Sequence, residues 1–157
     1  MARRFASRLP LVAAIVFALA PLGSGTALAG TTHMTLPFSN FIVLSPCNGE
    51  VVPFAGQVDI LVHGNQNGQG GHVVISDNTH GTGTGDQGND YILSAQGSGQ
   101  FDAATVEGTC FPPFHAEIIS EGAAPNFAVE GTDIVVVSGG LVTVFAVFSV
   151  DSTTCHG

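Results

Sequence analysis

Near its C-terminal end the chain reads Asn126-Phe-Ala-Val-Glu-Gly-Thr-Asp-Ile-Val-Val-Val-Ser138, then Gly139-Gly140, then Leu141-Val-Thr-Val-Phe-Ala-Val-Phe-Ser-Val150. β-Branched and aromatic residues favour strands, and a pair of glycines accepts the positive φ angles of a tight hairpin turn. The stretch therefore predicts a β-hairpin, and we expect the rest of the chain to pack against it.

A two-residue turn at Gly139-Gly140 places Ser138 opposite Leu141, which fixes the side chains that share a face of the hairpin. The expected inner face is mostly apolar and carries Val129, Gly131, Asp133, Val135, Val137, Val142, Val144, Ala146, Phe148 and Val150. The expected outer face is half polar and carries Glu130, Thr132, Ile134, Val136, Thr143, Phe145, Val147 and Ser149. Asp133 is thus predicted to be a carboxylate that points inward.

The first 29 residues have the parts of a secretory signal peptide. Three arginines precede an apolar run at 11–22 that is too short to span a bilayer, and Ala27-Leu28-Ala29 forms a small-x-small cleavage site. We expect cleavage after Ala29 by the general secretory route. The expected product is residues 30–157, a single secreted, extracellular domain without a membrane anchor.

Charge is distributed very unevenly along the chain. All three basic residues, Arg3, Arg4 and Arg8, lie in the predicted signal peptide, so twelve carboxylates of the mature chain face no Lys or Arg. Binding to nucleic acid or to an anionic membrane surface depends on such cations, so the sequence excludes both. It equally excludes a Schiff-base lysine and an arginine clamp on phosphate or carboxylate.

The mature chain predicts an all-β fold, because Val, Ile, Phe and Thr dominate its apolar stretches and no 3.6-residue periodicity occurs. Strands are expected at 36–44, 51–63, 72–77, 91–101, 106–110 and 115–121 and in the two arms of the hairpin. Residues 31–35 are expected to be irregular, and glycine-rich loops are expected at 64–71 and 78–90. About seven or eight short strands indicate a single antiparallel β-barrel or β-sandwich, and the sequential hairpins favour the barrel.

Three cysteines in an exported chain allow three pairings and leave one thiol. We favour Cys47–Cys155, which ties the turn before the first long strand to the end of the chain. Cys110 would then be a buried small hydrophobe, since no Lys or Arg is present to lower its pKa and make it a nucleophile.

Two short patterns suggest metal ions. His63 and His72 bracket the 64–71 loop, and two imidazoles with a nearby carboxylate can bind zinc or copper, although cross-strand His pairs also occur without metal. The run Gly85-Asp86-Gln87-Gly88-Asn89-Asp90-Tyr91-Ile92 resembles the calcium-binding nonapeptide of repeat toxins, with Asp86 and Asp90 as ligands. That repeat occurs once here, and the alternative is an acidic loop.

Asp133 is the candidate catalytic residue, because an inward carboxylate can act as an acid or a base. The alternative is a polar group satisfied by neighbouring hydroxyls or water. Ser98 lies between two glycines but lacks the remainder of a serine-hydrolase motif.

The markers Pro46-Cys47-Asn48-Gly49-Glu50, Gly70-Gly71-His72, Pro125-Asn126-Phe127 and Cys155 resemble those of a group of small secreted bacterial all-β proteins of unknown function. The resemblance covers most of the mature chain and implies the same fold and a Cys47–Cys155 disulfide, but no activity. Such proteins often have Asn-Gly where this chain has Gly139-Gly140, and Cys110 is outside the shared pattern.

The sequence therefore favours a secreted, non-enzymatic β-domain that binds a neutral or apolar ligand in a barrel interior or serves as a structural exoprotein. Its expected partner is a small molecule or an extracellular component, and no cofactor is expected apart from zinc or calcium at the positions above. The alternatives are a cofactor-free barrel enzyme that uses inward carboxylates and a His/Asp metal-binding protein.

Overall fold

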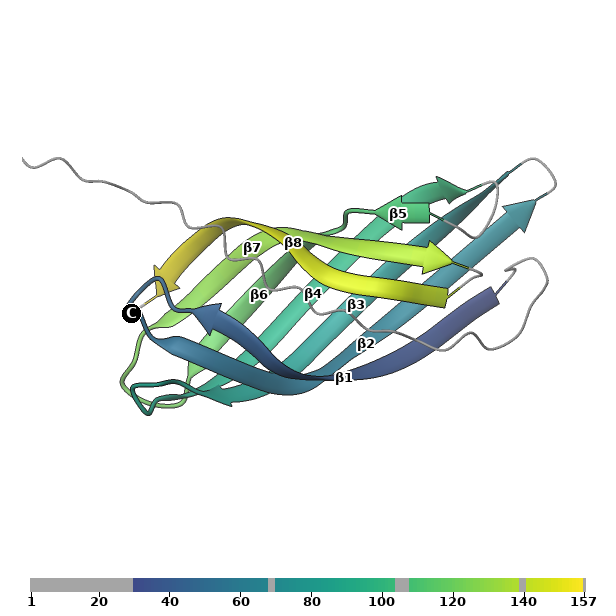
Figure 1. The fold of residues 1–157 in the computed structure, drawn as a ribbon. Coiled ribbons are helices and arrows are strands. Elements are labelled where there is room, and N and C mark those ends of the chain that lie inside the picture. Colours follow the sequence, from purple (N-terminus) through teal and green to yellow (C-terminus); the bar gives the residue numbers. More distant parts are fainter. Residues whose placement is uncertain (1–29, 68–69, 104–107, 139–140, 157) are drawn as a thin grey trace, which may run out of the picture.

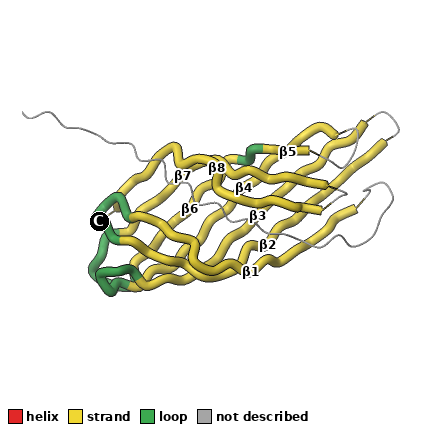
Figure 2. Tube along the Cα trace, in the orientation of Figure 1, coloured by secondary structure: helices red, strands yellow, loops and turns green. Residues whose placement is uncertain are grey.

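The computed structural model describes residues 30–67, 70–103, 108–138 and 141–156, and within these ranges the chain forms strands and short turns but no helix (Figures 1 and 2). The strands are β1 (Gly30–Leu44), β2 (Val51–Asn67), β3 (Gly70–Thr84), β4 (Asp90–Ala103), β5 (Gly108–Cys110), β6 (Pro113–Ser120), β7 (Asn126–Ser138) and β8 (Leu141–His156). The predicted signal peptide lies outside the described residues. The described part of the chain contains no helix that is long and apolar enough to cross a membrane.

All described strands belong to one antiparallel sheet, which confirms the all-β prediction. Strands β1, β2, β3, β4, β6 and β7 pair in that order, and β8 pairs with β7. The short β5 pairs with a different part of β7, opposite Val135–Val137, so β5 and β6 lie end to end along one edge of β7. The sheet curls about the long axis of the molecule, which brings β1 and β8 in front of β3 and β4 (Figure 1).

The concave side of this curl, the inner face, carries the hydrophobic core. In β2 the side chains of alternate residues are almost fully buried, namely Val52, Phe54, Val58, Ile60 and Val62. Leu61, between two of them, is 41% exposed. This alternation was predicted for 51–63 and is confirmed, because successive side chains of a strand point to opposite faces.

The strands are longer than the sequence predicts. Residues 31–35 belong to β1, β2 continues to Asn67, and β3 begins at Gly70 and ends at Thr84, so most of the predicted loops at 64–71 and 78–90 are strand. The glycines there permit close approach of neighbouring backbones: a Cβ on Gly56 would lie 2.6 Å from the Cα of its partner Gly81. The glycines in this region allow tight packing of neighbouring strands, and the prediction that they form loops was wrong.

The hairpin of β7 and β8 forms with the predicted Ser138–Leu141 pairing, while Gly139-Gly140 lies outside the described residues. Its faces differ from the prediction because the register shifts after Val137, and Val136 pairs with Val144 where Thr143 was expected. This β-bulge exchanges the two faces of β8 as far as Val147, and further register shifts at Thr132/Asp133 and Glu130/Gly131 change the facing again. Phe145, predicted to point outward, is therefore 8% exposed. Val150, predicted to point inward, pairs with Gly131 and lines a cavity on the inner face, although it is 40% exposed.

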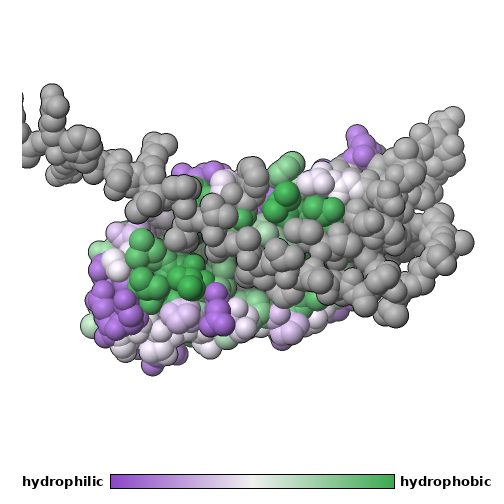
Figure 3. Space-filling view, in the orientation of Figure 1, coloured by the Kyte–Doolittle hydropathy of each residue, from purple (hydrophilic) through white to green (hydrophobic). Residues whose placement is uncertain are grey.

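Larger apolar side chains also remain on the outer surface. They are Ile42, Leu44, Val51, Leu61, Ile92, Phe111 and Ile119. Figure 3 shows apolar areas on one side of the molecule with polar side chains between them.

The predicted Cys47–Cys155 disulfide is present, with a Cα–Cα distance of 5.7 Å. It joins the β1–β2 turn to the end of β8, so the two edge strands of the curled sheet are linked covalently at one end. Cys110 is free and buried, and its burial raises the pKa of its thiol.

We predict that Cys47→Ser/Cys155→Ser lowers the free energy of unfolding by about 4–5 kcal/mol, because the bond closes a loop with a sequence separation of 108. Urea denaturation of the oxidised protein and the variant measures the difference. Cys110→Ala is the control and keeps the disulfide. Equal urea midpoints for the double variant and the parent would contradict the structural role of the bond.

Candidate functional site

Three carboxylates are buried among the described residues: Glu50, Asp77 and Asp133 are 0%, 6% and 3% exposed. Burying a charged carboxylate is costly unless hydrogen bonds or an opposite charge compensate for the loss of water. Because residues 30–157 contain no Lys or Arg, each of the three has to be satisfied by hydrogen bonds or by keeping its proton.

Glu50 is satisfied as an anion. It accepts hydrogen bonds from the Tyr91 hydroxyl at 2.8 Å, from Asn48 Nδ2 at 3.0 Å and from Asn89 Nδ2 at 2.9 Å. The backbone N–H groups of Gln87 and Asn89 donate two more, at 3.1 and 3.3 Å. Burial works against ionisation, but these donors together hold the pKa of Glu50 below its usual value. Glu50 thus fastens the β1–β2 turn to the β3–β4 turn and has a structural role.

Asp77 and Asp133 lie in very different surroundings. Both line a cavity of about 60 Å³ on the inner face, to which β1, β2, β3, β4, β6, β7 and β8 contribute. The other lining side chains are apolar apart from Thr79: Phe38, Phe41, Val58, Leu93, Ala95, Phe114, Ala116, Phe145, Ala146 and Val147. The predicted inward direction of Asp133 is therefore confirmed, and Asp77 is its partner in the same cavity.

Local features of the sequence make room for both carboxylates. Asp77, on β3, pairs with Gly97 on β4, where an added Cβ would lie 2.6 Å from Asp77 Oδ1. Asp133, on β7, lies beside the break between β5 and β6, where its backbone N–H donates to the carbonyl of Pro112 at 2.8 Å. A missing side chain and an interrupted strand thus leave space around the two acids.

The two acids differ in the ease with which they ionise. Burial raises the pKa of Asp77 to about 6, although backbone N–H groups of Asp77 and Gly97 favour its charged form. Burial, and then the charge of Asp77, raises the pKa of Asp133 to about 8. At neutral pH the pair accordingly shares one proton, and burial together with the charge of Asp77 favours that proton on Asp133. Asp77 Oδ1 is buried and has no hydrogen-bond partner.

Asp77 also borders the outer surface. A second hollow, of about 700 Å³, lies where the β4–β6 ladder ends at Gly97–Phe114, and we call it the notch. Its lining mixes polar and apolar groups and consists of Ser76, Asp77, Gln96, Gly97, Ser98, Pro113, Phe114, His115, Glu130, Gly131 and Asp151. Asp77 and Phe114 line both the notch and the inner cavity.

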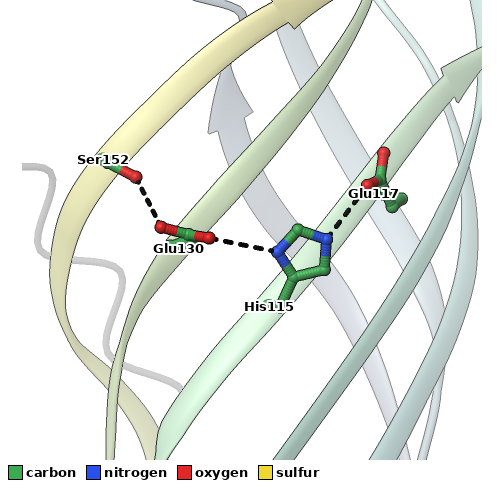
Figure 4. A network of polar contacts seen from close by, with 4 residues as sticks. All are labelled: His115, Glu117, Glu130 and Ser152. Atoms are coloured by element: carbon green, nitrogen blue, oxygen red, sulfur yellow. Dashed lines mark hydrogen bonds and ion pairs between the residues drawn. The ribbon is translucent and has the colours of Figure 1, made fainter.

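A polar network lies beside the notch (Figure 4). His115 Nε2 is 3.0 Å from Glu117 Oε1, and His115 Nδ1 is 3.7 Å from Glu130 Oε1. Ser152 Oγ donates to Glu130 Oε2 at 2.9 Å. The serine thus contacts the glutamate and not the histidine, so this network lacks the hydroxyl–imidazole contact of an activated nucleophile.

The histidines predicted to bind zinc or copper, His63 and His72, are exposed on the outer face, two residue pairs apart in the β2–β3 ladder. His63 Nδ1 lies 2.9 Å from Thr31 Oγ1, and His72 Nδ1 lies 2.6 Å from Asp102 Oδ1. Within the described ranges, no three His, Cys, Asp or Glu side chains converge as a metal site would require. The zinc site stays a prediction to which this geometry adds no support.

Of the residues predicted to bind calcium, Asp86 lies within the tight turn between β3 and β4, and Asp90 is the first residue of β4. Asp86 Oδ1 accepts from the backbone N–H of Val51 at 3.1 Å, and Asp90 Oδ1 accepts from Thr84 Oγ1 at 2.7 Å. These bonds give both acids a role in holding the turn. Calcium binding stays a prediction.

Asp77 was missed as a partner of Asp133, although the sequence carries a signal for it. Val73 and Ile75 are buried on the inner face, and Asp77 is the next residue in the same alternation.

The pH dependence of stability tests the buried acid pair. A raised pKa means that the folded chain holds its proton more tightly than the unfolded chain, in which the carboxyl titrates near 3.8. The stabilising contribution is complete below that pH and is lost as the pH rises through about 6 and about 8. We predict that urea midpoints fall over this range.

The variant Asp133→Asn should flatten the decline between pH 6 and 8, because its amide does not ionise. Asp102→Asn is the matched control, since the Asp102 side chain is 83% exposed. An Asp133→Asn curve parallel to that of the parent would rule out the buried, protonated state of Asp133.

Comparisons of the chain with protein-family models, with curated proteins and with solved structures find no match. The function is therefore inferred from the geometry of the site alone.

Proposed function

We propose that the protein is a secreted β-domain that binds a small, mostly apolar molecule on the inner face of its curled sheet, with the Asp77–Asp133 pair as its polar recognition group. The observation that carries this proposal is a pair of carboxyl groups, each less than a tenth exposed, in a cavity that is otherwise apolar except for Thr79. Small-molecule sites typically combine apolar walls with a few polar groups.

The size of the cavity limits the ligand. The space beside the acids measures about 60 Å³, and a second cavity of about 40 Å³ shares Phe41, Leu93, Phe114, Ala116 and Val147 with it. One water molecule needs roughly 10–15 Å³ of such space. A ligand of roughly five to ten non-hydrogen atoms would fill the two cavities together.

The charge of the site limits the chemistry of the ligand. An anionic molecule would meet Asp77 without any Lys or Arg to compensate, because residues 30–157 contain neither. A neutral molecule with one hydrogen-bond acceptor can instead accept the proton of Asp133. Export through the predicted signal peptide, together with the Cys47–Cys155 disulfide, suits an extracellular ligand.

Binding can be measured by methyl NMR with two probes of equal ring size, cyclopentanone and cyclopentane. We predict that both shift the methyl signals of Val58, Leu93 and Val147, and that cyclopentanone binds about tenfold more tightly because one hydrogen bond contributes about 1–1.5 kcal/mol. Asp133→Leu should remove this preference, whereas Asp102→Asn should keep it.

If neither probe shifts these signals at roughly 10 mM, the interior is closed to ligands of this size and binding of this kind is ruled out. The structural exoprotein would then be the better description. If both probes bind with equal affinity, the acid pair has no part in recognition.

A further inference from the structure

We propose that the Asp77–Asp133 pair also acts on the bound molecule, as a cofactor-free proton-transfer site for small neutral carbonyl compounds. Asp77 is the general base that removes a proton from the carbon next to the carbonyl, and Asp133 is the general acid at the carbonyl oxygen. This inference rests on the proposed interior binding.

The surroundings of Asp77 suit a base. Backbone N–H groups of Asp77 and Gly97 donate to its carboxylate and so favour the charged form. Asp77 lines the cavity, and its Oδ1 is buried without a hydrogen-bond partner among the described residues, so a lone pair is free to accept a proton. A free, desolvated carboxylate oxygen beside a binding cavity is the feature that a general base requires.

The surroundings of Asp133 suit an acid. Asp133 is 3% exposed and belongs to the same cavity, where the negative charge of Asp77 discourages a second ionisation. With the pKa of Asp77 raised to about 6 and that of Asp133 raised to about 8, the base is ionised and the acid protonated at pH 7. A carboxylic acid kept neutral in an apolar site can stabilise a developing enolate beside a carboxylate base.

The step conserves atoms and electrons. Asp77 takes the proton from the α-carbon, the electron pair of that C–H bond becomes the C=C bond of the enol, and the carbonyl π pair moves to the oxygen. Asp133 donates its hydrogen bond, or its proton, to that oxygen. Return of the proton to the same carbon exchanges hydrogen, and return to a conjugated carbon isomerises an unsaturated ketone. The net change is an isomerisation, so no oxidant, reductant or co-reactant is needed.

The notch supplies the route by which the pair exchanges protons with water. Asp77 borders both the inner cavity and the notch, so its carboxyl group connects the dry interior with solvent. The other titratable groups at the notch are His115, Glu130 and Asp151. Elsewhere the strands that surround the cavity contribute apolar side chains and Thr79. Burial and the repulsion between the two acids therefore govern the titration of the pair.

The test is hydrogen–deuterium exchange at the α-carbons of cyclopentanone in D2O, followed by proton NMR. We expect the protein to accelerate exchange at least about 100-fold over the same buffer, as general acid–base catalysis typically does. Asp77→Asn should abolish this acceleration and still bind cyclopentanone in the methyl NMR assay. Asp102→Asn, on the outer face, should exchange at the parental rate.

The pH profile separates chemistry from folding. The exchange rate should rise through about pH 6 and fall above about pH 8, following the two carboxyl groups. Asp133→Asn keeps a hydrogen-bond donor, so it should retain a reduced rate and lose the decline near pH 8. A structural role for Asp133 would leave the shape of the profile unchanged.

The outcomes distinguish this inference from the proposed function. Binding of cyclopentanone without accelerated exchange would overturn the inference and leave the binding proposal in place. Exchange in Asp77→Asn at the parental rate would also overturn it, because the base would then be another group. Absence of binding would overturn both.

Discussion

No side chain with a permanent positive charge is available to residues 30–157, and the buried part of the structure depends on this constraint. A buried carboxylate here is stabilised either by hydrogen bonds or by a retained proton. Glu50 takes the first course, with five donated hydrogen bonds that join two turns. Asp77 and Asp133 take the second course as a pair, because they share one proton. The same constraint thus yields a fixed anion at one end of the sheet and a proton-sharing pair in its interior.

The interior pair depends on the contacts at the disulfide-linked end of the sheet. The Cys47–Cys155 disulfide links the edge strands near the Glu50 network, since Cys47 and Glu50 belong to the same turn. Tyr91, which donates to Glu50, also packs edge-on against Phe127 of β7, with ring centroids 6.2 Å apart. These contacts hold the curl of the sheet, and the curl brings β3 and β7 close enough for their acids to line one cavity.

Local patterns in the sequence predict the strands and the direction of Asp133, because alternation and turn residues act over a few positions. The bulge beside Thr143 has no such signal, since it arises from the fit of β8 to the curl, and it reverses the expected position of Phe145. Glycines that permit close backbone contact, as at Gly56, are indistinguishable from loop glycines in one sequence. Asp77 and Asp133 belong to β3 and β7, which are not neighbours in the sheet. Their proximity results from the curl of the sheet and therefore cannot be predicted from local sequence patterns.

The acid pair is difficult to explain as packing alone. Val73 and Ile75 precede Asp77 on the inner face, and a third β-branched residue would continue the same alternation without burying a carboxylate. Asp133 likewise lies between Gly131 and Val135 in a strand whose buried positions are otherwise uncharged. Apolar residues of similar volume at such positions are often neutral or stabilising. Inward positions of a strand are normally apolar, and costly exceptions to such local rules tend to occur at functional sites. Asp77 and Asp133 are two such exceptions in one cavity.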